Sequence, residues 1–98
     1  MIRHAALFRL THSRGSAAEA DFLAALLALK NISGVQDFLL EREISAKNDF
    51  DFVVSMRFAN QADYNTYNDH PRHVAFVQSR WLPEVAAFME NDTVSLHV

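Results

Sequence analysis

The segment from Tyr64 to Phe76, YNTYNDHPRHVAF, holds the residues best suited to chemistry in this sequence. Proline is tolerated best at the first position of a helix, so Pro71 predicts a helix start and places His73 in the first turn. The helix dipole there disfavours an imidazolium, and burial beside a dry cavity would act in the same direction, so His73 is expected to be a neutral base. A hydroxyl from Tyr67, on the preceding helix, could donate to a carbonyl oxygen that gains charge during enolisation. The pattern therefore indicates proton transfer on a carbonyl compound.

The same residues also fit a purely structural role. Tyr67 can be a core aromatic, while His70 caps the junction between two helices and His73 bonds a backbone carbonyl. Two imidazoles three residues apart can also converge on a metal ion, but no third ligand stands at a telling spacing, so we expect no metal site. We interpret His70 and Pro71 mainly as a helix junction and Tyr67 with His73 as the part able to do chemistry.

The hydrophobic pattern predicts the elements that must hold these side chains. Residues 2–10 alternate as a strand does, and Ser16 followed by Glu19 is a capping-box pair that begins a helix running to about Asn31. Residues 35–44 and 50–59 are two further strands, separated by the polar turn 45–49.

The second half of the chain continues with helices and a last strand. Asn60 begins a short helix, Pro71 begins another, and Pro83 is expected to kink or restart it. From about Asn91 the chain is predicted to form a final strand, residues 93–98. The order β-α-β-β-α-β is that of an α+β, ferredoxin-like fold, in which helices cover one face of a four-stranded antiparallel sheet.

The composition is that of a packed globular protein that shares hydrophobic surface with a partner. Half of the 98 residues are apolar, with eight Phe and one Trp, and we expect a single domain over residues 1–98. A chain of this length buries only roughly 60 to 70% of its unfolded surface. We therefore expect a homodimer in which two sheets pack face to face into an α/β barrel, with higher assembly left open.

Charge and hydropathy exclude several classes of partner. The net charge is −3 without a basic cluster, so we expect no nucleic acid. There is no cysteine, which excludes disulfides and thiolate chemistry. No 18-residue apolar run and no signal-peptide pattern are found, so we expect no membrane association and a cytoplasmic protein.

Four segments together resemble a known family. They are the first strand with His4 four residues before Phe8, the helix end at 32–35 (ISGV), the strand FDFVVSMRF at 50–58, and the run YNDHPRH from Tyr67 to His73. With them the chain resembles the stress-response A/B barrel domain proteins, which belong to the dimeric α/β barrel superfamily. The YNDHPRH run is the most specific of the four.

The resemblance implies a particular chemistry for one set of residues. A plant branch of the family cyclises linear polyketide chains by intramolecular aldol condensation, without a metal or organic cofactor. Its working residues are a first-strand His, the Tyr of the Tyr-x-x-His-Pro-x-His run and the final His of that run. These positions are His4, Tyr67 and His73 here, which are therefore the expected catalytic residues, with no cofactor. His4 is expected to orient Tyr67 or to share its proton.

A mostly apolar small-molecule pocket should accompany this set, although about half of the large apolar residues are expected to be plain core. The candidate ligand-binding residues are Phe8, Phe52, Met56, His70, Phe76 and Trp81. Two functional hypotheses remain. One is a binding protein or cofactor-free enzyme of the cyclase, isomerase or lyase type, acting on a hydrophobic ketone or phenol. The other is a non-enzymatic, stress-associated structural protein that acts by assembly.

Overall fold

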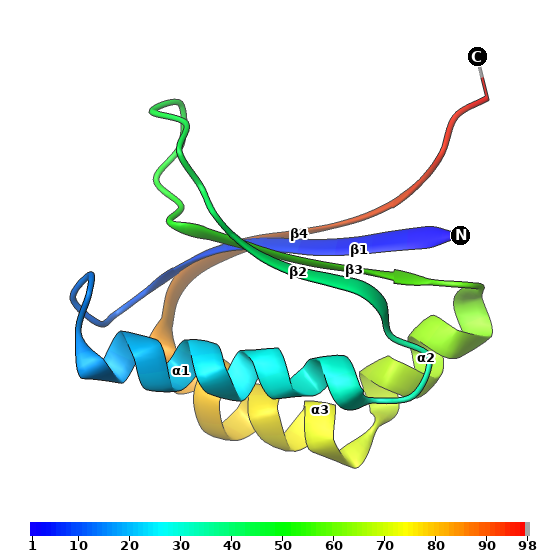
Figure 1. Cartoon of the computed structure of the whole chain (residues 1–98), viewed down its shortest axis with the longest axis horizontal. Helices are drawn as coiled ribbons and strands as arrows, with labels where there is room; N and C mark the ends of the chain where they lie inside the picture. The colour runs from blue at the N-terminus through cyan, green and yellow to red at the C-terminus, as the bar shows by residue number, and fades with distance from the viewer. Residues whose placement is uncertain (98) are drawn as a thin grey trace.

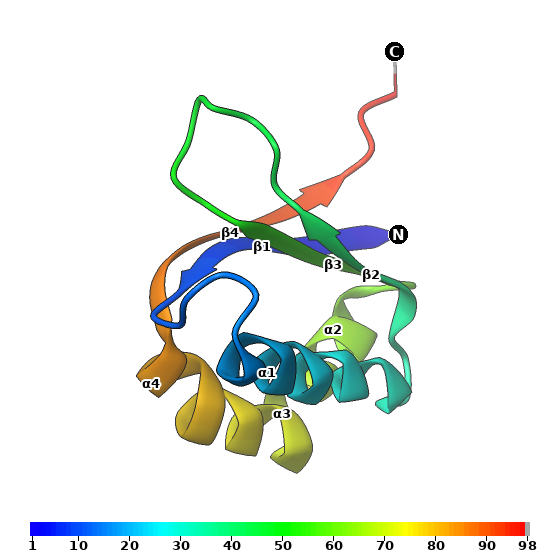
Figure 2. The ribbon, with the colours of Figure 1, turned by 60° about the vertical axis from the view of Figure 1, so that its left-hand side comes forward.

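The computed structural model describes residues 1–97 and arranges four antiparallel strands in one sheet, in the order β2-β3-β1-β4 (Figure 1). The strands are β1 (Ile2–Leu10), β2 (Gln36–Arg42), β3 (Phe52–Phe58) and β4 (Val85–Val94). All the helices lie on one side of the sheet, as the second view also makes clear (Figure 2). The predicted ferredoxin-like β-α-β-β-α-β fold is confirmed.

The two central strands carry the core because alternate residues point at the helices. β1 pairs with β3 so that His4 is opposite Met56 and Phe8 is opposite Phe52. Phe8 is fully buried, with its ring centroid 5.3 Å from that of Phe52 and 5.0 Å from that of Trp81. The aromatic residues thus fill one continuous core between the sheet and the helices.

The first helix begins and ends as the sequence predicts. In α1 (Ala17–Leu27) the Ser16 hydroxyl accepts the Glu19 N–H at 3.1 Å, and the Glu19 carboxylate accepts the Gly15 N–H at 3.2 Å. The last turn tightens into the 3₁₀ helix η1 (Ala28–Asn31). Gly34 then turns the chain with a φ of +92°, which is easily adopted only by glycine.

The second helical region consists of several short pieces. Asn60 caps α2 (Gln61–Asp69), and His70 caps α3 (Pro71–Phe76). The helix continues as the π-helical segment η2 (Val77–Trp81) and ends in α4 (Leu82–Glu84). Pro83 has no N–H to donate to the preceding turn, and the helix changes its geometry just before it, as expected of an interrupted helix.

The predicted last strand was placed too late. β4 runs from Val85 to Val94, and Ser95 to His97 are not in a strand, while Val98 lies outside the described residues. The apolar start of the strand was interpreted as helix, because its apolar residues continue the spacing of the preceding helix. Pairing with β1 along almost the whole strand overrides that local pattern.

The side of the sheet that faces away from the helices is open. Leu7 and Val53 from the central strands are half-buried there, while Leu39 and Met89 from the outer strands are 52% and 51% exposed. Figure 1 shows the β2–β3 loop and the C-terminal end rising on this same side. Within residues 1–97, none of the helices has both the length and the hydropathy needed to cross a lipid bilayer.

Candidate functional site

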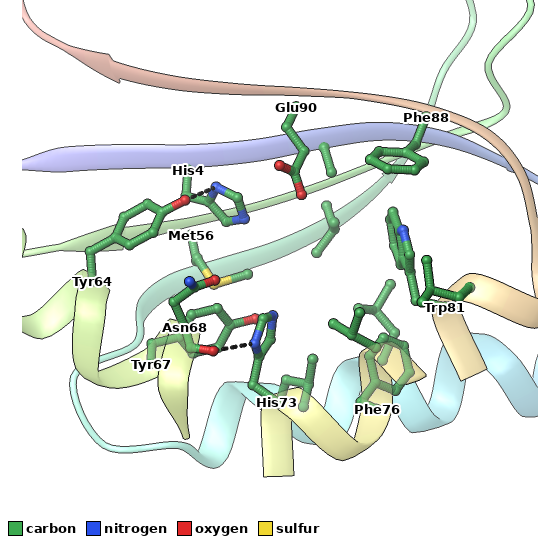
Figure 3. A pocket seen from close by; sticks show the side chains of 16 residues that line it. His4, Met56, Tyr64, Tyr67, Asn68, His73, Phe76, Trp81, Phe88 and Glu90 are labelled. Carbon is green, nitrogen blue, oxygen red and sulfur yellow. Dashed lines mark hydrogen bonds between the residues drawn. The ribbon is translucent and has the colours of Figure 1, made fainter. Parts of the chain in front are cut away.

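A cavity of about 260 Å³ lies between the helix-facing side of the sheet and the helices α2 and α3 (Figure 3). Known ligand pockets measure roughly 300–1,000 Å³, so this one suits a small molecule. Its lining residues are His4, Ala6, Leu26, Leu29, Val54, Met56, Tyr64, Tyr67, Asn68, His73, Phe76, Val77, Trp81, Leu82, Phe88 and Glu90. Most polar groups lie toward the end near α2, the Glu90 carboxylate lies between them and Phe88, and the wall toward Trp81 is apolar (Figure 3).

His4 reaches the cavity from β1 and is held by two neighbours. Its Nδ1 lies 2.6 Å from the Asp92 Oδ1 on β4, and the Tyr64 hydroxyl lies 3.1 Å from the same nitrogen. The Tyr64 hydroxyl also donates to Asp92, 3.0 Å from Oδ2. Burial, followed by this hydrogen bond to the carboxylate, raises the pKa of Tyr64, so its hydroxyl remains a donor.

Tyr67 presents an unengaged hydroxyl to the cavity. Its side chain is 3% exposed, yet among the described residues its hydroxyl has no hydrogen-bond partner. Every side-chain N or O atom sealed from solvent in this part of the chain does have a partner, so the hydroxyl must be open to the cavity. Burial raises the pKa of Tyr67, which keeps the proton in place for donation to a ligand.

His73 stands beside Tyr67 with one ring nitrogen occupied. Their ring centroids are 4.5 Å apart, and the His73 Nδ1 lies 3.0 Å from the backbone carbonyl oxygen of Asn68. A carbonyl only accepts, so Nδ1 carries the proton and Nε2 of the neutral ring is an acceptor.

The electrostatic surroundings keep this imidazole neutral. Burial lowers the pKa of His73 from the ordinary 6.5, against the opposing effect of the Asn68 carbonyl. His4 and His70 lower it further, and Glu90 raises it. The net result is a base that is unprotonated at neutral pH.

The predicted site residues divide into those that meet at the cavity and those that do not. His4, Tyr67 and His73 all line it, as do Met56, Phe76 and Trp81.

Phe8, Phe52 and His70 are not among the lining residues. The two phenylalanines pack within the core, where Phe8 contacts Phe22 of α1 and Trp81, and Phe52 packs on Phe8. His70 is the N-cap of α3, where its Nδ1 accepts the Arg72 N–H at 3.1 Å. The expected pairing of His4 with Tyr67 is not seen, because the tyrosine hydroxyl next to the His4 imidazole is that of Tyr64, 3.1 Å from Nδ1.

Sequence reasoning missed four polar residues in or beside the cavity. Tyr64 lies one helical turn before Tyr67, so the i, i+3 spacing could have placed both hydroxyls on one face of α2. Glu90 and Asp92 alternate on β4 and would have been found with the correct strand boundary. Asn68 contributes its backbone carbonyl, for which the sequence carries no signal.

The lining set has only one charged side chain that is not a histidine. Glu90 from β4 reaches toward the cavity in Figure 3, and no arginine or lysine lines the cavity within residues 1–97. In the same part of the chain, no three His, Cys, Asp or Glu residues lie close enough to hold a metal ion. The site therefore offers a ligand acid-base groups and hydrogen bonds, and its lining includes the acidic side chain of Glu90.

Solved structures with this architecture include three informative neighbours. A Dabb family protein with a ferredoxin-like fold from Mesorhizobium loti is 50% identical, with a TM-score of 0.95 over 98% of this chain and 97% of that chain. A dimeric ferredoxin-like protein of unknown function from Thermobifida fusca is 24% identical, with a TM-score of 0.79 over 96% of this chain and 90% of that one. A hydroxynitrile lyase from Passiflora edulis is 14% identical, with a TM-score of 0.86 over 99% of this chain and 94% of that one.

The last two likenesses, at low identity, demonstrate the fold alone. None of the curated proteins compared with this sequence matches it. The family model of the stress responsive A/B barrel domain (Dabb) matches residues 2–95, almost the whole chain. Together with the 50% identical neighbour, this match confirms the resemblance found in the sequence. The chain belongs to the stress responsive A/B barrel domain family.

Proposed function

We propose that this protein is a homodimer whose subunits each bind a small, uncharged carbonyl compound or phenol and move a proton on it without a cofactor. The observation that carries the proposal is the pairing of the His73 imidazole with the Tyr67 side chain at one cavity, their ring centroids 4.5 Å apart. One group is a neutral base and the other a protonated donor. This is the pair that enolisation of a ketone requires.

The reaction assigned to the pair is reversible proton transfer beside a carbonyl group. The Nε2 of His73 takes a proton from the carbon next to the carbonyl, and the electrons of that C–H bond move onto the oxygen. The Tyr67 hydroxyl donates a hydrogen bond to the oxygen as its negative charge grows. Return of the proton from the imidazolium to carbon completes the exchange cycle. In an aldol closure the enolate carbon attacks a second carbonyl in the same molecule, and the imidazolium gives its proton to the alkoxide oxygen formed there. Neither route needs a redox partner.

The lining supports an uncharged ligand over an acid. A carboxylate in the cavity would meet the Glu90 side chain and two imidazoles, with no arginine or lysine among the described lining residues to pair with it. Burying an unpaired charge is costly, so a ligand acid should be rejected while its neutral analogue is accepted. The apolar wall of Phe76, Trp81 and Phe88 suits a ring or an alkyl chain.

The assembly proposal rests on the open face of the sheet. Leu39 and Met89 are half-exposed there, while Ala5 and Ser55 in the centre are small enough for another sheet to approach closely. A second copy is the occupant that fits, because two such faces are alike and related neighbours are described as dimeric. Light scattering should give twice the chain mass for the wild type and a monomer or unfolded chain for Met89→Asp. Leu27→Asp, on the exposed side of α1, is the matched control and should leave the mass unchanged.

The chemistry is tested by deuterium exchange, which needs no knowledge of the natural substrate. Benzylacetone in D₂O is followed by proton NMR for loss of the signals beside its carbonyl group, with para-carboxybenzylacetone as the charged counterpart. We expect the wild type to accelerate exchange of the neutral ketone only, and both His73→Asn and Tyr67→Phe to lose this acceleration while remaining folded. Equal rates for the wild type and both variants across a panel of aryl ketones and β-diketones would contradict acid-base function and favour the assembly role.

A further inference from the structure

A carboxylate on β4 contacts one of the two imidazoles of the cavity. Asp92 lies directly opposite His4 in the β1–β4 ladder, and both side chains point to the helix side of the sheet. The Nδ1 of His4 is 2.6 Å from the Asp92 Oδ1. The His4 side chain is 12% exposed, so little water competes for it, whereas the Asp92 side chain is 51% exposed.

The direction of this hydrogen bond follows from the chemistry of its partners. An ionised carboxylate only accepts, so the proton between the two groups belongs to Nδ1 of His4. The Tyr64 hydroxyl, at 3.0 Å and 3.2 Å from the two Asp92 oxygens, donates to the same carboxylate. In the neutral ring the Nε2 of His4, which points into the cavity in Figure 3, is therefore left as an acceptor.

A competing arrangement is built into the same cluster. The Tyr64 hydroxyl is only 3.1 Å from the His4 Nδ1, and its ring meets the imidazole edge-on with centroids 5.2 Å apart. Without the carboxylate, the hydroxyl would have this nitrogen as its nearest acceptor. Donation from Tyr64 to Nδ1 would move the imidazole proton to Nε2, and the cavity would then face an N–H donor instead of a lone pair.

We propose that Asp92 is a positioning residue that fixes His4 as the Nδ1–H tautomer, and that Tyr64 is the alternative donor that reverses the tautomer when the carboxylate is absent. The cavity of the wild type then presents acceptor nitrogens from both His4 and His73, with Tyr67 as the donor. This consequence for ligands rests on the proposed function, since it concerns the same cavity. The tautomer itself is a property of the ligand-free protein.

Long-range proton–nitrogen correlation NMR of the ¹⁵N-labelled protein tests the tautomer directly. Spectra are recorded at a pH above which the ring signals no longer change, and the His4 ring is assigned by its disappearance in His4→Gln. We expect the wild type to show a protonated Nδ1 and an unprotonated Nε2. Asp92→Ala should show the reverse, and Tyr64→Phe, the matched control, should keep the wild-type pattern because the carboxylate remains.

The role of Tyr64 is isolated by the double variant Asp92→Ala with Tyr64→Phe, which should show a mixture of the two tautomers in place of full reversal. Should Asp92→Ala fail to fold, Asp92→Leu has a similar size without an acceptor and carries the same expectation. A wild type with the proton on Nε2, or an Asp92→Ala protein that keeps Nδ1–H, overturns the proposal. Both results are independent of the deuterium-exchange assay, which can fail while the tautomer is as proposed.

Discussion

Tyr67 and Tyr64 differ in one respect that stability measurements can detect. Both are tyrosines on the same face of α2, but among the described residues the Tyr67 hydroxyl has no hydrogen-bond partner, while the Tyr64 hydroxyl bonds Asp92 at 3.0 Å. The aromatic ring stays in a Tyr→Phe variant, so the packing of Tyr67 on Phe58, with centroids 5.2 Å apart, is retained. The two substitutions therefore isolate the hydroxyl groups.

The expected change in stability depends on whether removing each hydroxyl breaks a hydrogen bond within the protein. A typical hydrogen bond contributes about 0.5–1.5 kcal/mol to the free energy of unfolding, so Tyr64→Phe should lower it by about this amount. Tyr67→Phe removes a hydroxyl that opens to the cavity and has no hydrogen-bond partner among the described residues, so no protein hydrogen bond is lost. This substitution should change the free energy of unfolding by less than about 0.5 kcal/mol or increase it. A hydroxyl that binds a ligand and no protein group should be removable with little change in the free energy of unfolding.

Urea denaturation of the three proteins at one fixed chain concentration measures both values, since the stability of the proposed dimer would depend on concentration. The wild type and both variants must have the same slope against urea for the comparison to hold. A larger loss for Tyr67→Phe than for Tyr64→Phe would refute the reasoning. It would mean that the Tyr67 hydroxyl has a structural partner, as in the interpretation of Tyr67 as a core residue.

Three further predictions concern the core, the turn before β2 and the pH dependence. Phe8→Ala should destabilise the fold by about 3–5 kcal/mol in urea melts, whereas Leu27→Ala on the exposed side of α1 should cost less than half of that. Gly34→Ala should lower the free energy of unfolding by about 1–2 kcal/mol, because a φ of +92° strains a residue with a side chain even though the added Cβ would have room. A thermal melt with an unchanged midpoint would contradict this prediction. Because burial lowers the pKa of His73, the unfolded chain binds that proton more readily, so the free energy of unfolding should fall as the pH drops below 6.5. His73→Asn should flatten this part of the pH profile, and an equally steep profile in the variant would count against the assignment.

Local signals in the sequence were sufficient for most of the fold. The alternation of residues 2–10, the Ser16 cap and Pro71 at the first helical position each specify an element through interactions within a few residues. The order of the elements then leaves few topologies, which is why the ferredoxin-like fold could be predicted. The start of β4 was missed because its residues fit a helix locally and become a strand only by pairing with β1.

The site was predictable only in the part that is contiguous along the chain. Tyr67 and His73 lie within one helical junction, and the proline between them indicates how the second helix begins. The resemblance to the family added His4, which the structure brings to the same cavity. No local feature of the sequence distinguishes these residues from Phe8, Phe52 or His70. Only the packing of the folded chain places Phe8 and Phe52 in the core and His70 at a helix cap, away from the cavity lining.

The sequence by itself determined the elements, their order, the family and the His73–Tyr67 pair, because these depend on residues near one another in the chain. The tertiary structure decided that Tyr64 and Asp92, 60 and 88 residues from His4 along the chain, contact its imidazole. It also decided that Glu90 lines the cavity and that the Tyr67 hydroxyl is left without a partner among the described residues. These are consequences of strand register and helix docking, in which a shift of one residue would turn each β4 side chain to the other face of the sheet.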